Sequence, residues 1–401
     1  MRITTLDAVR GVAVMGILLA NIVAFGLPEA AYFSPLAWGG SSGANRLAWL
    51  LNVVFVEGRM RGLFSLLFGA SMLLVIERAE AVGNDPARIH LARMFWLFVI
   101  GCVHLYLFWW GDILAHYALV GTIALAFHRL PARTLVLLAA AVLALAVLWG
   151  AMGAVALFAS SARATPTQVA TWQAFSYAFG TPPRAHLLAE IAAMRGSFLD
   201  GAAWRWSTAM NPFAFLAVGG AETLSAMLLG MAAYRSGFVT GGWSNTTYRT
   251  VALLGIGVAT LGYGGLAALT LAHGFDQRWV YTAAMVASAP FRVAGFLGYA
   301  ALLVLLCGRG GALVARLAAV GRMAFSNYLG TTLMMDLVFT GWGLAQFARI
   351  DRAALYLMVP PVWALMLLWS PWWLQRFAYG PFEWLWRSLA RGRPQPVRRA
   401  S

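Results

Sequence analysis

The sequence predicts an all-α fold, a polytopic integral membrane helical bundle of about ten or eleven transmembrane helices, with one candidate for a broken helix. Three observations predict it: 61% of the 401 residues are hydrophobic, 11% are charged, and the mean hydropathy is +0.73. A soluble domain carries about 25% charged residues, so this chain has too few charges for a water-covered surface. These values exclude a soluble globular protein, a disordered chain and a nucleic-acid-binding protein.

Ten apolar runs are the candidate spans, because a helix that crosses a membrane needs roughly 20 mostly apolar residues. The runs are 8–27, 63–76, 94–110, 113–127, 134–158, 212–234, 251–272, 281–307, 323–347 and 353–374. The first run is interpreted as a retained helix rather than a signal peptide, since only a poor cleavage site follows it. The segment 47–56 is too short to cross alone, so it is either re-entrant or the first half of a broken helix.

Every basic residue is an arginine, because the chain contains no lysine. Most arginines flank apolar runs, so the net charge of +15 reflects topology and does not indicate a nucleic-acid partner. If the N-terminus lies in the cytoplasm and the spans alternate, most arginines fall in cytoplasmic loops. The positive-inside rule therefore predicts that both termini are cytoplasmic.

We expect a single transmembrane helical domain over residues 1–390. Its one long polar connection, the outer-side region at about 160–209, has room for one or two short interfacial helices. Residues 391–401 form a basic cytoplasmic tail for which we predict disorder. Cys102 and Cys307 lie in apolar runs, so the sequence predicts neither a disulfide framework nor a metal site.

Three ionisable residues fall near the middle of predicted spans, where a charge costs several kcal/mol unless it is paired or hydrated. They are Glu222, Arg292 and Asp336. One arginine and two carboxylates at similar depth predict an internal ion-pair cluster. Such a cluster either ties three helices together or lines a site, and buried pairs do not reliably stabilise a protein. The sequence leaves both interpretations open.

The segment 101–121 reads GCVHLYLFWWGDILAHYALVG and predicts two helices that meet at a turn near the outer surface. Asp112 and His116 are four residues apart and share one helical face. His104 lies on the neighbouring helix and could approach that face. A histidine beside a carboxylate can act as a general base. Alternatively, Asp112 only caps the second helix.

Three further charges, Glu57, Arg59 and Arg61, lie between two apolar pieces in the stretch EGRMRGLFSLLFG. They cannot face lipid, because an unpaired charge at membrane depth is too costly. We expect them either at the outer interface or around a cavity where the helix is broken.

Five sequence blocks resemble the YeiB family of bacterial inner-membrane proteins, in the same order and over nearly the whole chain. The blocks are LDAVRGVAVMGILLAN, LFSLLFG, HLYLFWWGDILAHYALVG, GRMAFSNYL and GPFEWLWR. The resemblance implies a multi-pass protein of the inner membrane. It also implies a distant similarity to transmembrane acyltransferases, which share a first helix that opens like LDAVRG. Where the sugar O-acyltransferases among them place a histidine after the arginine that Arg10 matches, this chain has Asn21, which cannot act as a base.

The first functional hypothesis is therefore acyl transfer from a thioester, with acyl-CoA as a candidate donor and no other cofactor named. Arg10 would hold the anionic part of the donor. His104, oriented by Asp112 or Glu57, would take the proton from the acceptor. The acceptor would be a small molecule or an envelope glycan or lipid. The hypothesis requires His104 to share a hydrated chamber with acidic and guanidinium neighbours.

In the same hypothesis, Arg59, Arg61 and Asn21 would stabilise the developing oxyanion. The remaining substrate-binding candidates are His116, Glu222, Arg292, Asn327 and Asp336. The second hypothesis is a transporter or permease with an intramembrane charged pathway. The third is a structural or signalling subunit whose charges only hold helices together. The lipid bilayer is the expected partner in each case, and a homo-oligomer is left open.

Overall fold

The computed structural model describes residues 4–398, and this part of the chain is helical with no β-strand. Eight stretches in it are long and apolar enough to cross a membrane, which confirms the predicted polytopic helical bundle. They are Thr4–Gly26, Gly43–Ala81, Pro86–Leu107, Ala132–Ala162, Pro212–Arg235, Asn245–Ala272, Ala289–Cys307 and Arg352–Arg376.

Ten helices of the described chain coincide with the ten predicted spans, and the other helices lie between or after them. The ten are α1 (Thr4–Gly26), α3 (Arg59–Ala81), α4 (Pro86–Leu107), α5 (Leu114–Ala124), α6 (Ala132–Ala159), α10 (Pro212–Arg235), α11 (Asn245–Ala272), α13 (Ala289–Cys307), α15 (Ala324–Phe339) and α17 (Val359–Arg376). The other helices are α2 (Gly43–Phe55), α7 (Pro166–Phe179), α8 (Arg184–Arg195), α9 (Phe198–Thr208), α12 (Gln277–Tyr281), α14 (Ala312–Arg322), α16 (Arg352–Leu355) and α18 (Pro381–Ala390). Single 3₁₀ turns lie at Glu29–Ala31 (η1), Leu125–Phe127 (η2), Ser160–Ala162 (η3), Phe238–Thr240 (η4) and Tyr356–Met358 (η6), and a π-helical turn at Thr282–Ala287 (η5).

Two of the ten predicted spans are shorter than a membrane crossing. The run 113–127 forms α5 and the turn η2. The run 323–347 forms α15, which ends at Phe339 because the chain leaves the helix there to contact α8. The Gly341 amide donates a hydrogen bond to the Met194 carbonyl at 2.9 Å.

The helix predicted to be broken is divided into α2 and α3. Val56 and Glu57 both donate their amides to the Asn52 carbonyl, which closes the first piece. Gly58 then has φ +71°, a left-handed conformation that glycine adopts without a steric cost. The segment 47–56 therefore belongs to the first half of a broken helix, α2.

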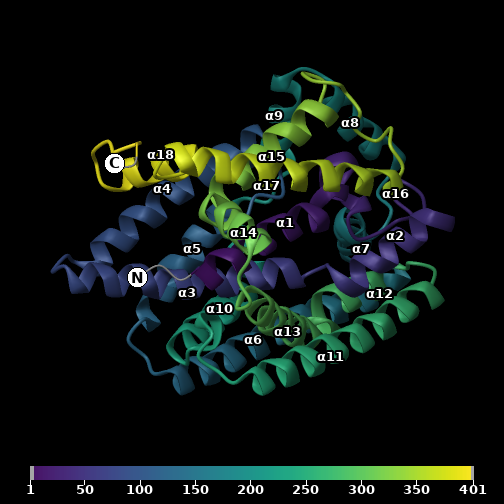
Figure 1. Ribbon diagram of the computed structural model, residues 1–401. Coiled ribbons are helices and arrows are strands. Elements are labelled where there is room, and N and C mark those ends of the chain that lie inside the picture. Colours follow the sequence, from purple (N-terminus) through teal and green to yellow (C-terminus); the bar gives the residue numbers. More distant parts are fainter. Residues whose placement is uncertain (1–3, 399–401) are drawn as a thin grey trace.

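Helix α1 lies inside the bundle and packs along α14, a helix that none of the predicted spans covers (Figure 1). The two helices approach closely, since a Cβ on Gly321 would lie 1.8 Å from the Asp7 carbonyl oxygen. Small residues allow such close packing of membrane helices. The start of α1 and the C-terminal helix α18 lie at one end of the molecule, and α2 and α8 lie towards the other (Figure 1).

The region 160–209, which is predicted to lie on the outer side, holds three short helices, α7, α8 and α9, where one or two were expected. The tail for which we predicted disorder is held against the chain over its described part. The Ala378 amide donates to the Val397 carbonyl at 2.9 Å, and the Trp384 indole donates to the Gln395 carbonyl at 2.8 Å. Residues 399–401 of that tail lie outside the described residues.

Candidate functional site

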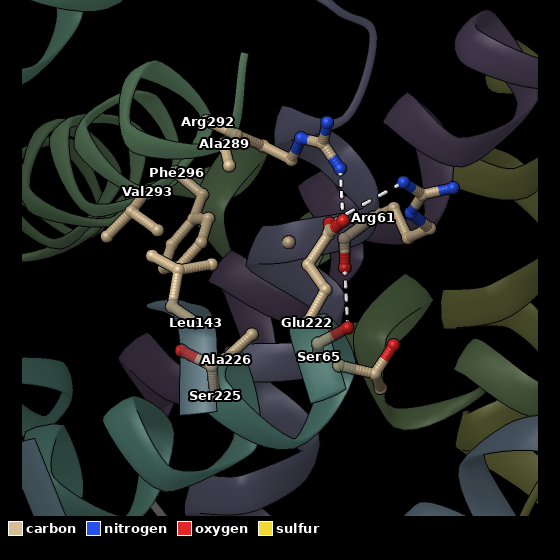
Figure 2. Close-up of a pocket in the computed structure, with 12 residues that line it drawn as sticks. Arg61, Ser65, Leu143, Glu222, Ser225, Ala226, Ala289, Arg292, Val293 and Phe296 are labelled. Atoms are coloured by element: carbon tan, nitrogen blue, oxygen red, sulfur yellow. Dashed lines mark hydrogen bonds and ion pairs between the residues drawn. The ribbon is translucent and has the colours of Figure 1, made fainter. Parts of the chain in front are cut away.

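The centre of the candidate site is the carboxylate of Glu222 on α10, which lies between two guanidinium groups (Figure 2). Arg292 on α13 donates from Nη1 to the Glu222 Oε2 atom at 2.5 Å. Arg61 on α3 places Nη2 3.6 Å from Glu222 Oε1. The predicted pairing of Glu222 with Arg292 is therefore present, and it joins three helices.

This ion-pair centre is accessible although the three helices that form it belong to stretches long and apolar enough to cross a membrane. The side chains of Glu222 and Arg61 are 29% and 37% exposed, whereas that of Arg292 is only 5% exposed. They line a cavity of about 10 Å³, with Val293 and Phe296 on its apolar wall (Figure 2). That volume holds about one water molecule. Because charges facing lipid are costly, the open side of this centre must be hydrated or occupied.

The local fold of α13 holds Arg292 in place. Its Nη2 atom donates to the Ala284 carbonyl at 2.7 Å and to the Ser288 hydroxyl at 2.6 Å. Ala284 lies in the π-helical turn η5, whose wider winding often marks functional positions in helices. Arg292 therefore reaches Glu222 with its guanidinium already fixed by the backbone.

A tyrosine and a second carboxylate lie close to this centre. The Tyr32 hydroxyl donates to Glu57 Oε2 at 2.6 Å, and Glu57 lies in the break between α2 and α3, four residues before Arg61. Burial, followed by the charge of Glu57, raises the pKa of Tyr32 well above its usual value of 10. Tyr32 thus remains a hydrogen-bond donor at physiological pH. We call Tyr32, Glu57, Arg61, Glu222 and Arg292 the charged network.

His116 approaches the charged network from α5. Its Nε2 atom lies 2.9 Å from the hydroxyl of Thr223, which lines the cavity, and its ring packs on Phe215. Among the described residues nothing bonds its Nδ1 atom. The imidazole that neighbours guanidinium and carboxylate groups is therefore His116.

His104 does not belong to the charged network, contrary to the expectation that it shares a chamber with guanidinium groups or is oriented by Glu57. Its Nδ1 lies 2.7 Å from Asp112 Oδ1 and its Nε2 lies 2.9 Å from the Thr332 hydroxyl. The residue is 3% exposed and lines neither of the two cavities described here. Among the described residues, its two hydrogen-bond partners are Asp112 and Thr332, and neither is an arginine.

Asp112 combines the two roles that the sequence left as alternatives. One carboxylate oxygen contacts His104, and the other accepts the Ala115 amide at 2.8 Å. The second contact satisfies one of the free amides at the start of α5, as a capping residue does. Asp112 is therefore both the partner of His104 and a helix cap.

Arg59 makes its hydrogen bonds outside the charged network, although the charges of Glu57 and Arg292 act on it. Its expected role in stabilising an oxyanion stays a prediction. Arg59 is 1% exposed and donates to the carbonyls of Val53 and Ala259, each at 3.2 Å. Its guanidinium also lies 4.1 Å from the centre of the Tyr263 ring. These contacts tie α2 and α3 to α11.

Asp336 does not join Glu222 and Arg292, so the predicted three-member cluster is wrong. The end of α15 carries Asp336 into a second cavity, whose lining includes Arg205 of α9. Asp336 is 5% exposed there. Its charge and that of Arg205 attract each other, but they lie beyond ion-pair distance.

The remaining candidates are dispersed. Arg10 pairs with Asp7 at 3.0 Å and donates to the Ser71 hydroxyl at 2.5 Å, near the start of α1. Asn21 is half-buried, and none of the described residues bonds its side chain. Asn327 is buried and donates to the Val320 carbonyl and the Ser370 hydroxyl.

Within residues 4–398 no group of three His, Cys, Asp or Glu side chains is arranged to hold a metal ion.

Comparison with known proteins gives relatives along the whole chain. Residues 233–393 match the family described as "Protein of unknown function (DUF418)". The chain is 34% identical to "Uncharacterized protein YeiB" of Escherichia coli (strain K12), over 97% of this chain and 96% of the relative. It is 30% identical to "Uncharacterized protein YxaH" of Bacillus subtilis (strain 168), over 99% of this chain and 96% of the relative. No solved structure matches the chain.

Proposed function

Since this chain belongs to the YeiB family, we propose that it is a membrane-embedded acyltransferase of the bacterial inner membrane whose reacting groups meet at the charged network. The observation that supports this proposal is the accessible Arg61–Glu222–Arg292 centre beside the Tyr32–Glu57 hydrogen bond. Acyl transfer needs a base and a positive charge next to the reacting carbonyl. The charged network contains both kinds of group, the carboxylate of Glu57 and the guanidinium groups of Arg61 and Arg292.

The proposed reaction moves an acyl group from a thioester to an acceptor hydroxyl or amine. Glu57 accepts the proton of the acceptor, whose oxygen or nitrogen bonds to the carbonyl carbon. Arg61 stabilises the oxyanion that forms, because its side chain is the more exposed of the two guanidinium groups beside Glu222. The carbon–sulfur bond then breaks, and the proton passes to the departing thiolate.

Glu222 and Arg292 have a positioning role in this proposal. Arg292 is fixed by Ala284 and Ser288, and Glu222 in turn holds Arg61. Two guanidinium groups flank one carboxylate at the cavity, so positive charge is in excess there. This balance favours a negative charge, such as that of the oxyanion that forms on the carbonyl oxygen when the acceptor adds to the carbonyl carbon.

The test measures thiol release from acetyl-CoA by the purified full-length protein, with extracted envelope lipids and glycans as acceptors. We expect Glu57→Gln to lower the rate about 10²–10⁴-fold, the usual contribution of a general base. Glu77→Gln is a matched control, because Glu77 also accepts a tyrosine hydroxyl, that of Tyr234 at 2.8 Å, but lies outside the charged network. Acyl transfer that continues unchanged in folded Glu57→Gln would contradict the role of Glu57.

A transporter remains the second candidate, and one observation favours it. Both α3 and α13, which carry the two arginines, follow an interruption, namely the break at Gly58 and the π-helical turn η5. Interrupted helices form the binding sites of many secondary transporters. Uptake of a labelled small anion into sealed vesicles that contain only this protein, without consumption of a thioester, would favour transport over acyl transfer.

A further inference from the structure

A second cavity lies between α9, α15 and the turn η1, and no residue lines both this cavity and the one beside Glu222. Its volume is about 20 Å³. Three carboxylates line it, from Glu29 of η1, Glu190 of α8 and Asp336 of α15. Arg205 is the one basic residue of the lining. We call this cavity the carboxylate chamber.

The carboxylate of Asp336 is buried in the chamber wall without a partner. Asp336 is only 5% exposed. No described residue donates a hydrogen bond to its carboxylate or lies within ion-pair distance of it. Arg205 is directed elsewhere, since it donates from Nη2 to the Leu107 carbonyl at 2.5 Å and from Nε to the Tyr106 carbonyl. An uncompensated buried charge is costly. Among the described residues, the chamber therefore provides no cation paired with Asp336.

Glu190 and Glu29 add two further carboxyl groups to the chamber. Glu190 is 5% exposed, and its Oε1 atom accepts the backbone amide of Glu29 at 2.9 Å. Burial raises the pKa of Glu190 to about 8 and that of Glu29 to about 7. Near neutral pH both groups are poised between their charged and neutral forms, so a bound cation would favour their ionised forms.

The walls of the chamber are aromatic. The indole rings of Trp109, Trp110 and Trp204 line it. Trp110 and Trp204 are half-buried and Thr208 is exposed, so the chamber reaches the surface on this side. Tryptophan faces attract cations, and Trp is the strongest of the aromatic residues in this respect. Carboxylates and indole rings together favour an organic cation over an anion.

We propose that the carboxylate chamber binds a primary ammonium group, supplied either by a free small amine or by the amine headgroup of a lipid. A cavity of about 20 Å³ accepts a head of about the size of one water molecule, which fits an ammonium group and excludes a quaternary ammonium. An ammonium group donates hydrogen bonds, and the buried carboxylate of Asp336, which has no partner among the described residues, provides an acceptor for one of them. The site is independent of the acyl transfer proposed above.

The test measures binding of ethylamine to the purified full-length protein by calorimetry at pH 8, in a detergent without amino groups. We expect saturable binding by the wild-type protein, and at least about tenfold weaker binding by Asp336→Asn, since it removes a charged hydrogen-bond acceptor. Asp351→Asn is the control, because Asp351 is exposed and lies outside the chamber. Tetramethylammonium and potassium should not compete with ethylamine.

Vesicles then distinguish the two sources of the amine. Stronger association of the protein with phosphatidylethanolamine than with phosphatidylcholine, lost in Asp336→Asn, indicates a lipid headgroup, and equal association indicates a free amine. Glu190→Gln is a second variant for the case that Asp336→Asn does not fold, because glutamine still accepts the Glu29 amide. Any of three results would overturn the proposal. The wild type does not bind ethylamine, the folded variants bind it as tightly as the wild type, or potassium displaces it as well as unlabelled amine does.

Discussion

At the residue scale, the His104 imidazole has a partner at each ring nitrogen, Asp112 at 2.7 Å and Thr332 at 2.9 Å. The pair links α4 and the start of α5 to α15, and the ring is enclosed by Trp109 and Tyr328. The sequence correctly suggested that His104 approaches Asp112. It could not show Thr332, which is 228 residues away along the chain, or the burial that separates the ring from the charged network.

We therefore expect His104→Ala to act mainly on stability. The substitution leaves a cavity and two buried polar groups without a partner, which costs about 2–4 kcal/mol. Thermal unfolding in detergent should show a lower midpoint, while the acyl-transfer rate per folded molecule stays within about a factor of three. A loss of rate of 10²-fold or more in the fraction that remains folded would instead make His104 part of the chemistry.

Glu190 gives a prediction on pH dependence. Its carboxyl pKa is about 8 in the folded protein, against 4.5 for the ordinary group, because burial disfavours the charge. The folded state therefore binds more protons than the unfolded state between those values, and its contribution to stability falls as pH rises from 4.5 to 8. Glu190→Gln should weaken this decline, so that its unfolding midpoint exceeds that of the wild type by a few degrees at pH 8.5. Parallel curves for the two proteins from pH 5 to pH 8.5 would contradict the prediction.

At the element scale, Glu57, Arg61 and Arg292 of the charged network lie at or just after helix interruptions, whereas Glu222 lies within the continuous helix α10. Arg59 and Arg61 are two positions apart, so on a helix they project to different sides, and only Arg61 reaches Glu222. Helical spacing alone could have separated these two arginines. It could not have found Tyr32, which comes from a loop, or α14, which has only 11 residues and carries two arginines.

Substitution of Gly58 tests whether the break between α2 and α3 positions the residues of the charged network. Gly58→Ala places a Cβ 2.9 Å from Arg292 Cδ and Nε, on a backbone with φ +71°. We expect a destabilisation of about 1 kcal/mol and, because Arg292 must move, a loss of activity of at least tenfold. Gly83→Ala is the matched control, since Gly83 has φ +73° and nothing within 4 Å of the added Cβ. Equal activities of the two variants would show that the break does not position Arg292.

At the scale of the whole molecule, composition and apolar runs were sufficient to predict an all-helical membrane bundle. Eight stretches of the described chain have the required length, and the start of α1 lies at the same end as α18 (Figure 1). It was not predictable which distant helices would pack together, because nothing in an apolar sequence shows which face of a helix contacts which neighbour. The separation of Asp336 from Glu222 is the clearest example, since similar depth in two spans does not imply adjacent faces.

The cytoplasmic position of both termini stays a prediction, and labelling of single cysteines can test it. Starting from a variant in which Cys102 and Cys307 are replaced, cysteine is placed at Gly83 or at Ser207, both exposed. In intact spheroplasts we expect an impermeant maleimide to label Ser207→Cys and to spare Gly83→Cys until the membrane is opened. The reverse pattern would invert the topology.

The region 160–209 is fastened to the bundle at three separate points. Arg205 donates to the Leu107 carbonyl, Glu190 accepts the Glu29 amide, and the Arg195 Nε atom donates to the Phe347 carbonyl at 2.7 Å. Its short helices therefore depend on the membrane-embedded part for their shape. A peptide comprising this region alone should be unstructured in water, and an antibody raised against that peptide should recognise the denatured chain better than the intact protein.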